Sequence, residues 1–243
     1  MNLIIDIGNT RIKAAVFEND KLIEVFVFEI EVLLEKVEFL SEKYSIKKGI
    51  ISSVKNISKK ILKQLSKKTP FLVLDSSTKV PFKNLYKTPE TLGVDRIALV
   101  SNAVEKFHNK NVLIIDAGTC ITYDFVNEHK EYLGGAISLG IEMRYIALNK
   151  FTSKLPLLKK NSPKNFIGNT TDDNIHSGVN NGVLNEINGV IEQYERENPL
   201  LTIVLTGGDT YFLAKQLKSS IFANPNFVLE GLNTILIYNN KEC

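Results

Sequence analysis

Leu3-Ile4-Ile5-Asp6-Ile7-Gly8-Asn9-Thr10-Arg11-Ile12-Lys13 stands near the start of the chain, and the rest of the sequence is best understood from it. An apolar run reaches an aspartate and a glycine, short polar residues follow, and a second apolar run begins at Ile12. This pattern predicts a strand, a tight turn and a second strand, with Asp6 at the exit of the first strand. Gly8 permits either a positive φ or the close approach of a ligand to the backbone. Free backbone N–H groups in such a turn can cradle a phosphate, and the aspartate can hold the accompanying metal.

The same pattern returns in the middle of the chain as Leu113-Ile114-Ile115-Asp116-Ala117-Gly118-Thr119. A second apolar run, 121–126, follows it, and both copies lead into similar polar turns at 19–21 and 127–130. Two matching supersecondary units indicate an internal duplication. The sequence therefore predicts two lobes, residues 1–108 and 109–243, that each offer a phosphate turn and hold a nucleotide between them.

The composition excludes several classes of protein. The 243 residues are 44% hydrophobic and 23% charged, with a net charge of +3, which is typical of a globular chain. Lysines crowd residues 43–68, but they alternate with apolar residues at helical spacing, which favours solvated helix faces over a nucleic-acid surface. No apolar run could cross a membrane, and the N-terminus does not resemble a signal peptide. Cys120 and Cys243 provide no disulfide framework, which suits the reducing cytoplasm. From these features together we expect a cytoplasmic protein without nucleic-acid or membrane partners.

Hydrophobic periodicity predicts the remaining elements of a mixed α/β chain. After the first two strands, the first half is expected to contain, in order, a strand, a helix, a strand, a helix and a strand at residues 21–28, 31–43, 49–54, 57–67 and 71–74. In the second half we expect strands at 112–115, 121–126, 131–138 and 201–205, and helices at 141–149, 172–197 and 211–217. The long helix has a predicted weak point near 180–182. A short strand near Phe227 and a helix at 229–238 complete the expected fold.

Between the two halves lies a polar stretch, 75–89, followed by Gly93-Val94-Asp95-Arg96 and a helical pattern from 96 to 107. One interpretation is a simple helix start, in which Asp95 complements the helix dipole and Arg96 is exposed. The other is an acid and a cation directed at a polar substrate. Two glycine pairs, Gly134-Gly135 and Gly207-Gly208, add further positions where the backbone can approach another group closely.

These features favour phosphoryl transfer from a nucleotide. The chain has neither the Gly-x-x-x-x-Gly-Lys-Ser/Thr loop of P-loop enzymes nor the signature set of protein kinases. The three histidines, His108, His129 and His176, have no metal-ligand spacing, and Cys120 is interpreted as a small strand residue.

Three motifs carry a resemblance to a known superfamily. Asp6-Ile7-Gly8-Asn9-Thr10, Asp116-Ala117-Gly118-Thr119 and Thr206-Gly207-Gly208 resemble the phosphate-1, phosphate-2 and adenosine motifs of the actin, sugar-kinase and Hsp70 superfamily. Within it, the first motif together with Tyr86-x-x-Pro89-x-x-Leu92-Gly93-x-Asp95-Arg96 resembles type III pantothenate kinases, almost from end to end of the chain. The resemblance implies a duplicated ribonuclease H-like (actin-like ATPase) fold whose two lobes each have a mixed five-stranded sheet and helices. It also implies ATP-dependent phosphorylation of pantothenate to 4'-phosphopantothenate, the first step of coenzyme A biosynthesis.

The resemblance also implies roles for individual residues. Asp95 would accept the proton of the pantothenate hydroxyl, and Asp116 would bind a monovalent cation, K⁺ or NH₄⁺. Asp6 would lie near Mg²⁺. The residues expected at ATP are Asp6, Ile7, Gly8, Asn9, Thr10, Arg11, Ile12, Lys13 and Thr119. Those expected at pantothenate are Tyr86, Gly93, Val94, Asp95, Arg96 and Thr171.

In the family this threonine comes from the partner subunit, so the resemblance implies a homodimer with the site near the subunit interface. Thr170 is a neighbouring candidate for the same role. One departure concerns Leu139, which stands where the family usually has a proline, in a turn near the nucleotide cleft.

Two other functions stay open at this point. The chain could be a regulator that keeps the fold and serves as an accessory factor for transcription, although intact Asp6, Asp95, Arg96 and Asp116 argue against it. It could also be a kinase of the same superfamily that acts on another hydroxylated substrate.

Overall fold

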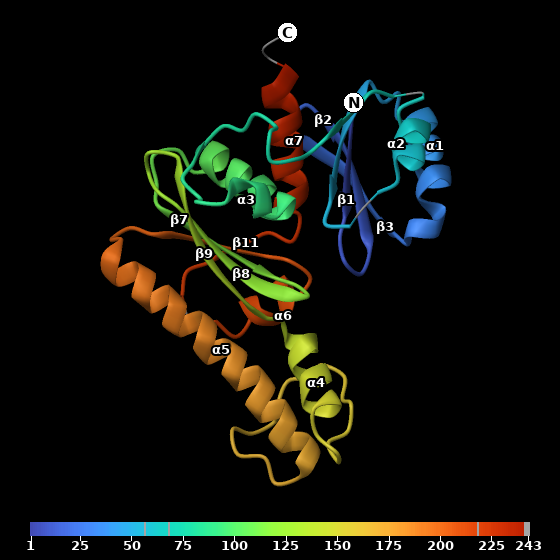
Figure 1. Cartoon of the computed structure of the whole chain (residues 1–243). Coiled ribbons are helices and arrows are strands. Elements are labelled where there is room, and N and C mark those ends of the chain that lie inside the picture. The colour runs from blue at the N-terminus through green and yellow to red at the C-terminus, as the bar shows by residue number, and fades with distance from the viewer. Residues whose placement is uncertain (56, 68, 218, 241–243) are drawn as a thin grey trace. The chain divides into compact units, whose positions relative to one another are not determined.

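The computed structural model of the chain describes residues 1–55, 57–67, 69–217 and 219–240 (Figure 1). Its contacts divide the chain into two compact units. Unit 1 comprises Met1–Asn109, Val126–Gly134 and Asn226–Cys243, and unit 2 comprises Lys110–Phe125 and Gly135–Pro225. The predicted lobes, 1–108 and 109–243, are defined by the repeated sequence motif, whereas the two units are defined by contacts between residues. Because the two divisions rest on different criteria, the lobes stay a prediction. Cys243 lies outside the described residues.

Unit 1 contains a mixed five-stranded sheet with the order β3-β2-β1-β4-β5. β1 pairs antiparallel with β2 and parallel with β4, as the predicted hairpin and crossover require. The predicted order of strands and helices up to residue 74 is confirmed. The bounds are β1 Asn2–Ile7, β2 Ile12–Glu18, β3 Lys21–Phe28, η1 Ile30–Val32, α1 Leu33–Lys43, β4 Lys48–Ser53, α2 Lys59–Leu65 and β5 Phe71–Val73.

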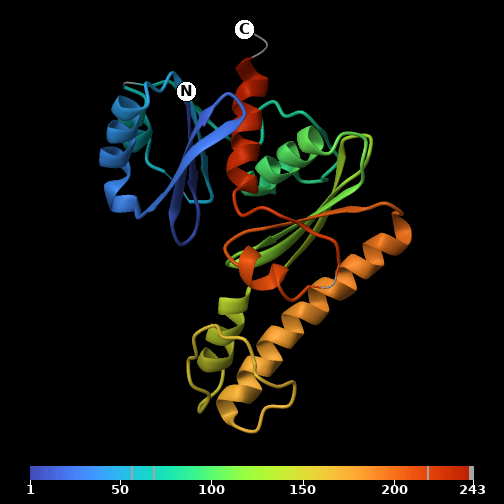
Figure 2. The ribbon, with the colours of Figure 1, turned by 180° about the vertical axis from the view of Figure 1, so that it is seen from behind.

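Strand alternation decides which residues of β1 face which helices. Leu3, Ile5 and Ile7 pack into a core with buried residues of α1, and this face of the sheet is the one that α1 covers (Figure 2). The residues in between project from the opposite face, where Asn2 Nδ2 donates a 2.9 Å hydrogen bond to Asn233 Oδ1 of helix α7 (Phe227–Asn240). Asp6 shares the parity of Asn2, so it points away from α1 and towards the α7 face.

On this second face α7 packs against α3 (Val94–Lys106). A Cβ on Gly231 would lie 1.9 Å from the backbone oxygen of Ala98, so the glycine allows the two helices to approach closely. Asn102 Nδ2 adds a 2.9 Å bond to the carbonyl of Phe227. The predicted strand near Phe227 is wrong, because Phe227 begins α7 and is fully buried; the nearby strand is β11 (Phe222–Ala223).

The second sheet has the order β11-β10-β7-β8-β9-β6. In the described part of the chain it therefore has six strands, and the predicted number of five is wrong for this sheet. The extra edge strand is β6 (Lys83–Asn84), which lies in the stretch interpreted as a linker and pairs parallel with Glu131 and Tyr132. The other bounds are η2 Pro89–Thr91, β7 Val112–Ala117, β8 Cys120–Val126, β9 Glu131–Leu139 and β10 Thr202–Thr206.

Unit 2 packs one face of this sheet against a long helix, α5 (Thr171–Glu197), with Leu113, Ile115, Val183 and Ile187 in a shared core (Figure 1). α5 is continuous through the predicted weak point. The buried Asn180 there donates from Nδ2 to the carbonyls of His176 and Asn161, each at 2.8 Å, so its polar side chain is tolerated. The remaining helices are α4 (Ile141–Lys150) and α6 (Thr210–Ala214). Among the helices of the described residues, none is both long and apolar enough to span a bilayer.

Candidate functional site

The first phosphate turn connects β1 to β2. Gly8 N donates a 3.2 Å hydrogen bond to Arg11 O, and Asn9, Thr10 and Arg11 are exposed. The described glycines with positive φ are Gly134 and Gly207, so of the two roles left open for Gly8 the positive φ does not apply. A Cβ at Gly8 would lie 3.2 Å from Arg11 O, and the small residue therefore serves the tight turn. Ile7 and Ile12 are buried and anchor the turn to the sheet.

Asp6 stands at the centre of a small charged cluster in unit 1. In the sheet it lies opposite Lys13 of β2 and opposite Ser52 of β4. The pKa of Asp6 is raised from 3.8 to about 6, first by burial of its carboxyl group and then by the nearby Asp95 carboxylate, against the opposing effects of Lys13 and Ser52. The positive charge of Lys13 does not fully offset burial and the Asp95 carboxylate, so a bound cation would stabilise the ionised Asp6.

Asp95 and Arg96 occupy the first turn of α3. Asp95 Oδ1 accepts a 2.8 Å hydrogen bond from the backbone N–H of Arg96, and a Cβ at Gly93 would lie 2.5 Å from that oxygen. Arg96 is only 6% exposed, so the interpretation in which Arg96 is a solvated surface residue is wrong. Its guanidinium carbon lies 5.8 Å from the centre of the Tyr86 ring, which is within the range of a cation–π contact.

Tyr86 is held in place from two sides in unit 1. Its ring stacks on that of Tyr132 with centroids 6.1 Å apart, and its backbone N–H donates a 2.9 Å bond to Asn84 Oδ1. Gly134 has a φ of 109°, and a Cβ there would lie 3.4 Å from the Tyr86 ring. At Gly135 a Cβ would lie 1.6 Å from Tyr123 O, so the predicted close backbone approach at this glycine pair is confirmed. Asp6, Asp95 and the Tyr86–Arg96 pair all belong to unit 1.

The second phosphate turn and the adenosine-type turn meet in unit 2. Gly207 has a φ of 94°, and a Cβ at this position would lie 2.3 Å from Ala117 O and 2.4 Å from Asp116 Oδ1. The backbone N–H of Asp209 donates a 2.9 Å bond to Ala117 O, which fastens one turn to the other. Thr119 is exposed at the tip of the second turn. Two segments that are distant in the sequence are thus brought together around Asp116.

The two candidate threonines at the start of α5 differ in their surroundings. Thr170 is the N-cap: its Oγ1 accepts a 3.1 Å hydrogen bond from Asp173 N and donates a 2.8 Å bond to Asp173 Oδ2. Thr171 instead lines an apolar cavity of about 830 Å³ between α4 and α5. Leu139, at the position where a proline was expected, lines the same cavity, and its carbonyl accepts a 2.9 Å bond from Arg144 Nε.

The metal ions implied by the resemblance can be tested against these residues. Within the described residues, no group of three or more histidine, cysteine, aspartate or glutamate side chains could hold a metal by itself. Mg²⁺ usually needs only one or two carboxylates in addition to substrate phosphates, so Asp6 fits that demand. For a monovalent cation, the Asp116 carboxylate and the Ala117 carbonyl both border the space that a Cβ at Gly207 would fill, so oxygen ligands are present there too.

Two features were missed by the sequence interpretation. Ser52 lies beside Asp6, and its only sequence signal is a polar residue at the end of an apolar run. Lys160 forms an ion pair with Asp209 of the adenosine-type turn and lies 5.1 Å from the centre of the Phe212 ring. Nothing in the loop around Lys160 predicted this contact, because it depends on how residues 151–170 fold back.

The two mixed sheets with their covering helices, the paired Asp-x-Gly turns and the acidic helix start define an actin-like ATPase and sugar-kinase type of protein. Solved structures agree: a glucokinase from an Antarctic psychrotroph covers 98% of this chain at a TM-score of 0.52 and 12% identity, which shows the fold. A Campylobacter jejuni protein, described as a candidate Baf family transcriptional activator, covers 98% at a TM-score of 0.65 and 25% identity, and 99% of its own chain is matched.

The family model for type III pantothenate kinases matches residues 2–193. The type III pantothenate kinase of Christiangramia forsetii is 50% identical over 244 residues, with the whole of both chains covered. That of Flavobacterium psychrophilum is 46% identical over 239 residues, covering 98% of this chain and 99% of its own. The chain therefore belongs to the type III pantothenate kinase family.

Proposed function

We propose that this chain transfers the terminal phosphoryl group of ATP to the primary hydroxyl of pantothenate, which yields 4'-phosphopantothenate and ADP and begins coenzyme A biosynthesis. The observation that carries this proposal is the arrangement in unit 1, where Asp95 at the start of α3 acts electrostatically on Asp6 of the phosphate turn. Membership of the type III pantothenate kinase family supports the same reaction.

In this reaction Asp95 is the proton acceptor. A primary alcohol has too high a pKa to be ionised beforehand, so the proton moves to Asp95 as the hydroxyl oxygen bonds to phosphorus and the bond to the ADP oxygen breaks. General-base catalysis of this kind contributes about 10²- to 10⁴-fold in rate. The position of Asp95 in the first turn of α3 suits a negative charge, because free helix N–H groups stabilise it.

The nucleotide is proposed to bind to the turn from Asp6 to Lys13 and to Thr119. Asn9 and Thr10 are exposed, and the backbone N–H groups of such a turn can bond phosphate oxygens, while Lys13 adds a positive charge beside Asp6. Magnesium, when bound with the nucleotide, neutralises the charge of the phosphates, with Asp6 as its proposed protein ligand. Asp116 is proposed to hold a monovalent cation, supported by its position beside the Ala117 carbonyl and Gly207.

Pantothenate is proposed to bind near Tyr86, Gly93, Val94 and Arg96. The Arg96 guanidinium offers a planar set of donors that suits a carboxylate, and its contact with the Tyr86 ring keeps it oriented. Gly93 leaves room next to the Asp95 carboxylate, where any side chain would collide.

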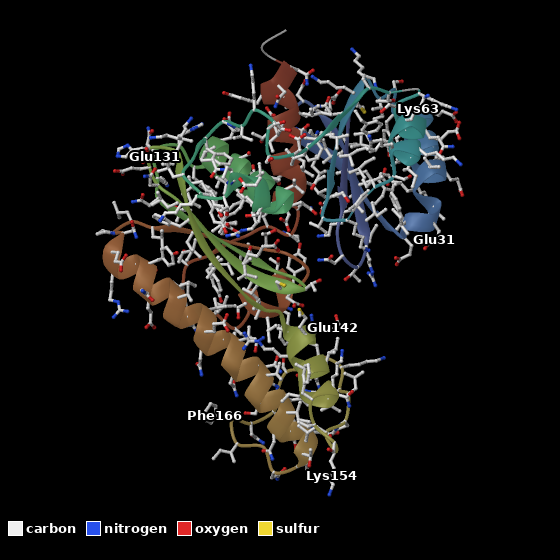
Figure 3. All side chains as sticks on the ribbon, in the orientation of Figure 1. Glu31, Lys63, Glu131, Glu142, Lys154 and Phe166 are labelled. Atoms are coloured by element: carbon white, nitrogen blue, oxygen red, sulfur yellow. The ribbon has the colours of Figure 1, made fainter. Side chains whose placement is uncertain are left out.

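We further propose a homodimer in which Thr171 of one subunit contacts the substrate of the other. The hydroxyl of Thr170 already serves the helix cap, which favours Thr171 for this role. Large apolar side chains near it are exposed: Phe151 is 82%, Phe166 76% and Ile167 81% exposed, and Figure 3 shows Phe166 in the loop beside α5. Apolar groups exposed together in this way are typical of a surface that another protein covers.

The test is ATP-dependent phosphorylation of pantothenate by the purified full chain, with Mg²⁺ and K⁺ present and mass spectrometry of the product. A product heavier by one phosphoryl group is the expected result. If pantothenate is unchanged while another hydroxylated compound is phosphorylated, the substrate proposal is wrong and the kinase class survives. If the folded protein phosphorylates no compound, the result favours the alternative that the chain is an accessory regulator.

A further inference from the structure

Ser52 is a buried residue whose hydroxyl lacks a hydrogen bond of standard geometry within the described part of the chain. It lies on β4, is fully buried, and its Oγ makes no hydrogen bond of standard geometry with any described residue. Buried polar groups nearly always have a hydrogen-bond partner, so an exception in a native structure calls for an explanation.

The register of the sheet places Ser52 next to Asp6. The two residues lie opposite each other in the parallel pairing of β1 with β4, and adjacent strands lie about 4.8 Å apart. Paired residues of neighbouring strands project from the same face, so the hydroxyl and the carboxylate share the α7 side of the sheet. Burial is the largest cause of the raised pKa of Asp6, and a weak side-chain hydrogen bond from Ser52, outside standard geometry, acts in the opposite direction.

The neighbouring serine has a different task. Ser53 Oγ donates to Lys55 O at 2.7 Å and accepts from Lys55 N at 3.1 Å, which shapes the turn after β4. The Ser53 hydroxyl therefore stabilises the local turn. The Ser52 hydroxyl lies on the same side of the sheet as Asp6 and makes no other hydrogen bond within the described residues.

We propose that Ser52 is a positioning residue for Asp6, an inference that rests on the proposed function. Its hydroxyl donates a hydrogen bond to one oxygen of the Asp6 carboxylate when the magnesium–nucleotide complex binds, which leaves the other oxygen for the cation. Groups that orient a carboxylate ligand in this way commonly contribute about 10- to 100-fold to metal affinity or activity.

The experiment measures ADP binding to the full chain by isothermal titration calorimetry, with Mg²⁺ and separately with EDTA, for the wild type, Ser52→Ala, Ser52→Thr and Ser53→Ala. We expect Ser52→Ala to weaken binding in Mg²⁺ about tenfold or more and to leave binding in EDTA within about twofold. Ser52→Thr keeps the hydroxyl and should recover most of the magnesium-dependent affinity. Ser53→Ala is the matched control and should retain it.

Thermal unfolding separates positioning from a structural role. Because the Ser52 hydroxyl makes no standard bond in the free protein, Ser52→Ala should unfold at the same temperature as the wild type or higher. If Ser52→Ala binds ADP in Mg²⁺ within twofold of the wild-type affinity, the inference is wrong. The proposed function would still stand in that case, provided that the wild type binds ADP and phosphorylates pantothenate. A wild type that does not bind ADP would overturn both.

Discussion

Burial and, after it, the carboxylate of Asp95 at the start of α3 raise the pKa of Asp6 at the end of β1. The two acids come from segments separated by most of unit 1, and their charges oppose each other in a partly buried place. Two like charges held close together lower the stability of the folded protein. Such pairs are typical of functional sites, where they bind a cation or take part in a proton transfer. This relationship is the physical basis for assigning a cation–phosphate role to one acid and a proton-acceptor role to the other.

Replacing the proposed proton acceptor should separate binding from chemistry. Asp95→Asn keeps the shape of the side chain but cannot take the hydroxyl proton, so kcat should fall about 10²- to 10⁴-fold. ADP binding should be retained, or become tighter, because one negative charge near Asp6 is gone. Steady-state kinetics and calorimetry check the two parts. Turnover within a few-fold of wild type would remove Asp95 from the proposed mechanism.

The raised pKa of Asp6 predicts a pH dependence of stability. Between pH 3.8 and about 6 the native state keeps a proton that the unfolded chain has lost, so the free energy of unfolding falls as pH rises through that window. Asp6→Asn removes the charge and should stabilise the free protein at pH 8 by about 1–3 kcal/mol, with little effect at pH 4. Urea unfolding at both pH values measures this, and Asp20→Asn in an exposed turn is the control. Equal stabilisation at the two pH values would contradict the assignment.

The adjacent glycines of the third turn should respond very differently to alanine. Gly207→Ala places a Cβ 2.3 Å from Ala117 O at a φ of 94°, so we expect a loss of about 1–3 kcal/mol and impaired nucleotide binding. At Gly208 a Cβ would have no neighbour within 4 Å, and Gly208→Ala is the matched control. Thermal unfolding and ADP binding are measured on both variants. If Gly207→Ala and Gly208→Ala have similar unfolding temperatures and ADP affinities, the turn adopts another conformation.

The two threonines before α5 allow a similar comparison. Thr170→Ala removes the N-cap bond to Asp173 N and should cost about 1 kcal/mol of stability with a small effect on kinetics. Thr171→Ala should leave stability unchanged and raise the KM for pantothenate. Unfolding curves and substrate titrations on each variant check the pair. If Thr170→Ala were the variant with the raised KM at unchanged stability, the assignment would be reversed.

The proposed monovalent cation site predicts dependence on the added salt. Activity of the wild type should be higher in K⁺ or NH₄⁺ than in Na⁺ at equal ionic strength. Asp116→Asn should lower activity and remove most of the difference between the salts, because a neutral amide attracts a cation less than a carboxylate does. Initial rates in the three chlorides measure this. A wild type indifferent to the cation would refute the role of Asp116.

Much of the fold follows from local pattern. The alternation around Asp6 and its repeat at Asp116 predict the hairpins, and the helical spacing of apolar residues predicts α1, α3 and α5 within a few residues of their observed bounds. Errors fall where a short segment has no pattern of its own. β6 is two residues long and exists only because Glu131 and Tyr132 offer it an edge, and the apolar stretch at Phe227 suits a strand or a helix equally well until α3 packs against it.

The sequence by itself determined most of the elements, the family and the types of residue at the site, because these depend on periodicity and on motifs of a few adjacent residues. Only the tertiary structure decided that Arg96 is buried against Tyr86, that Thr170 is spent on a helix cap while Thr171 faces a cavity, and that Ser52 lies opposite Asp6. The physical reason is that burial and pairing join segments far apart in the chain. The segments that meet are those that together bury the most apolar surface. That total is a property of the whole fold, so it cannot be obtained from a local sequence pattern.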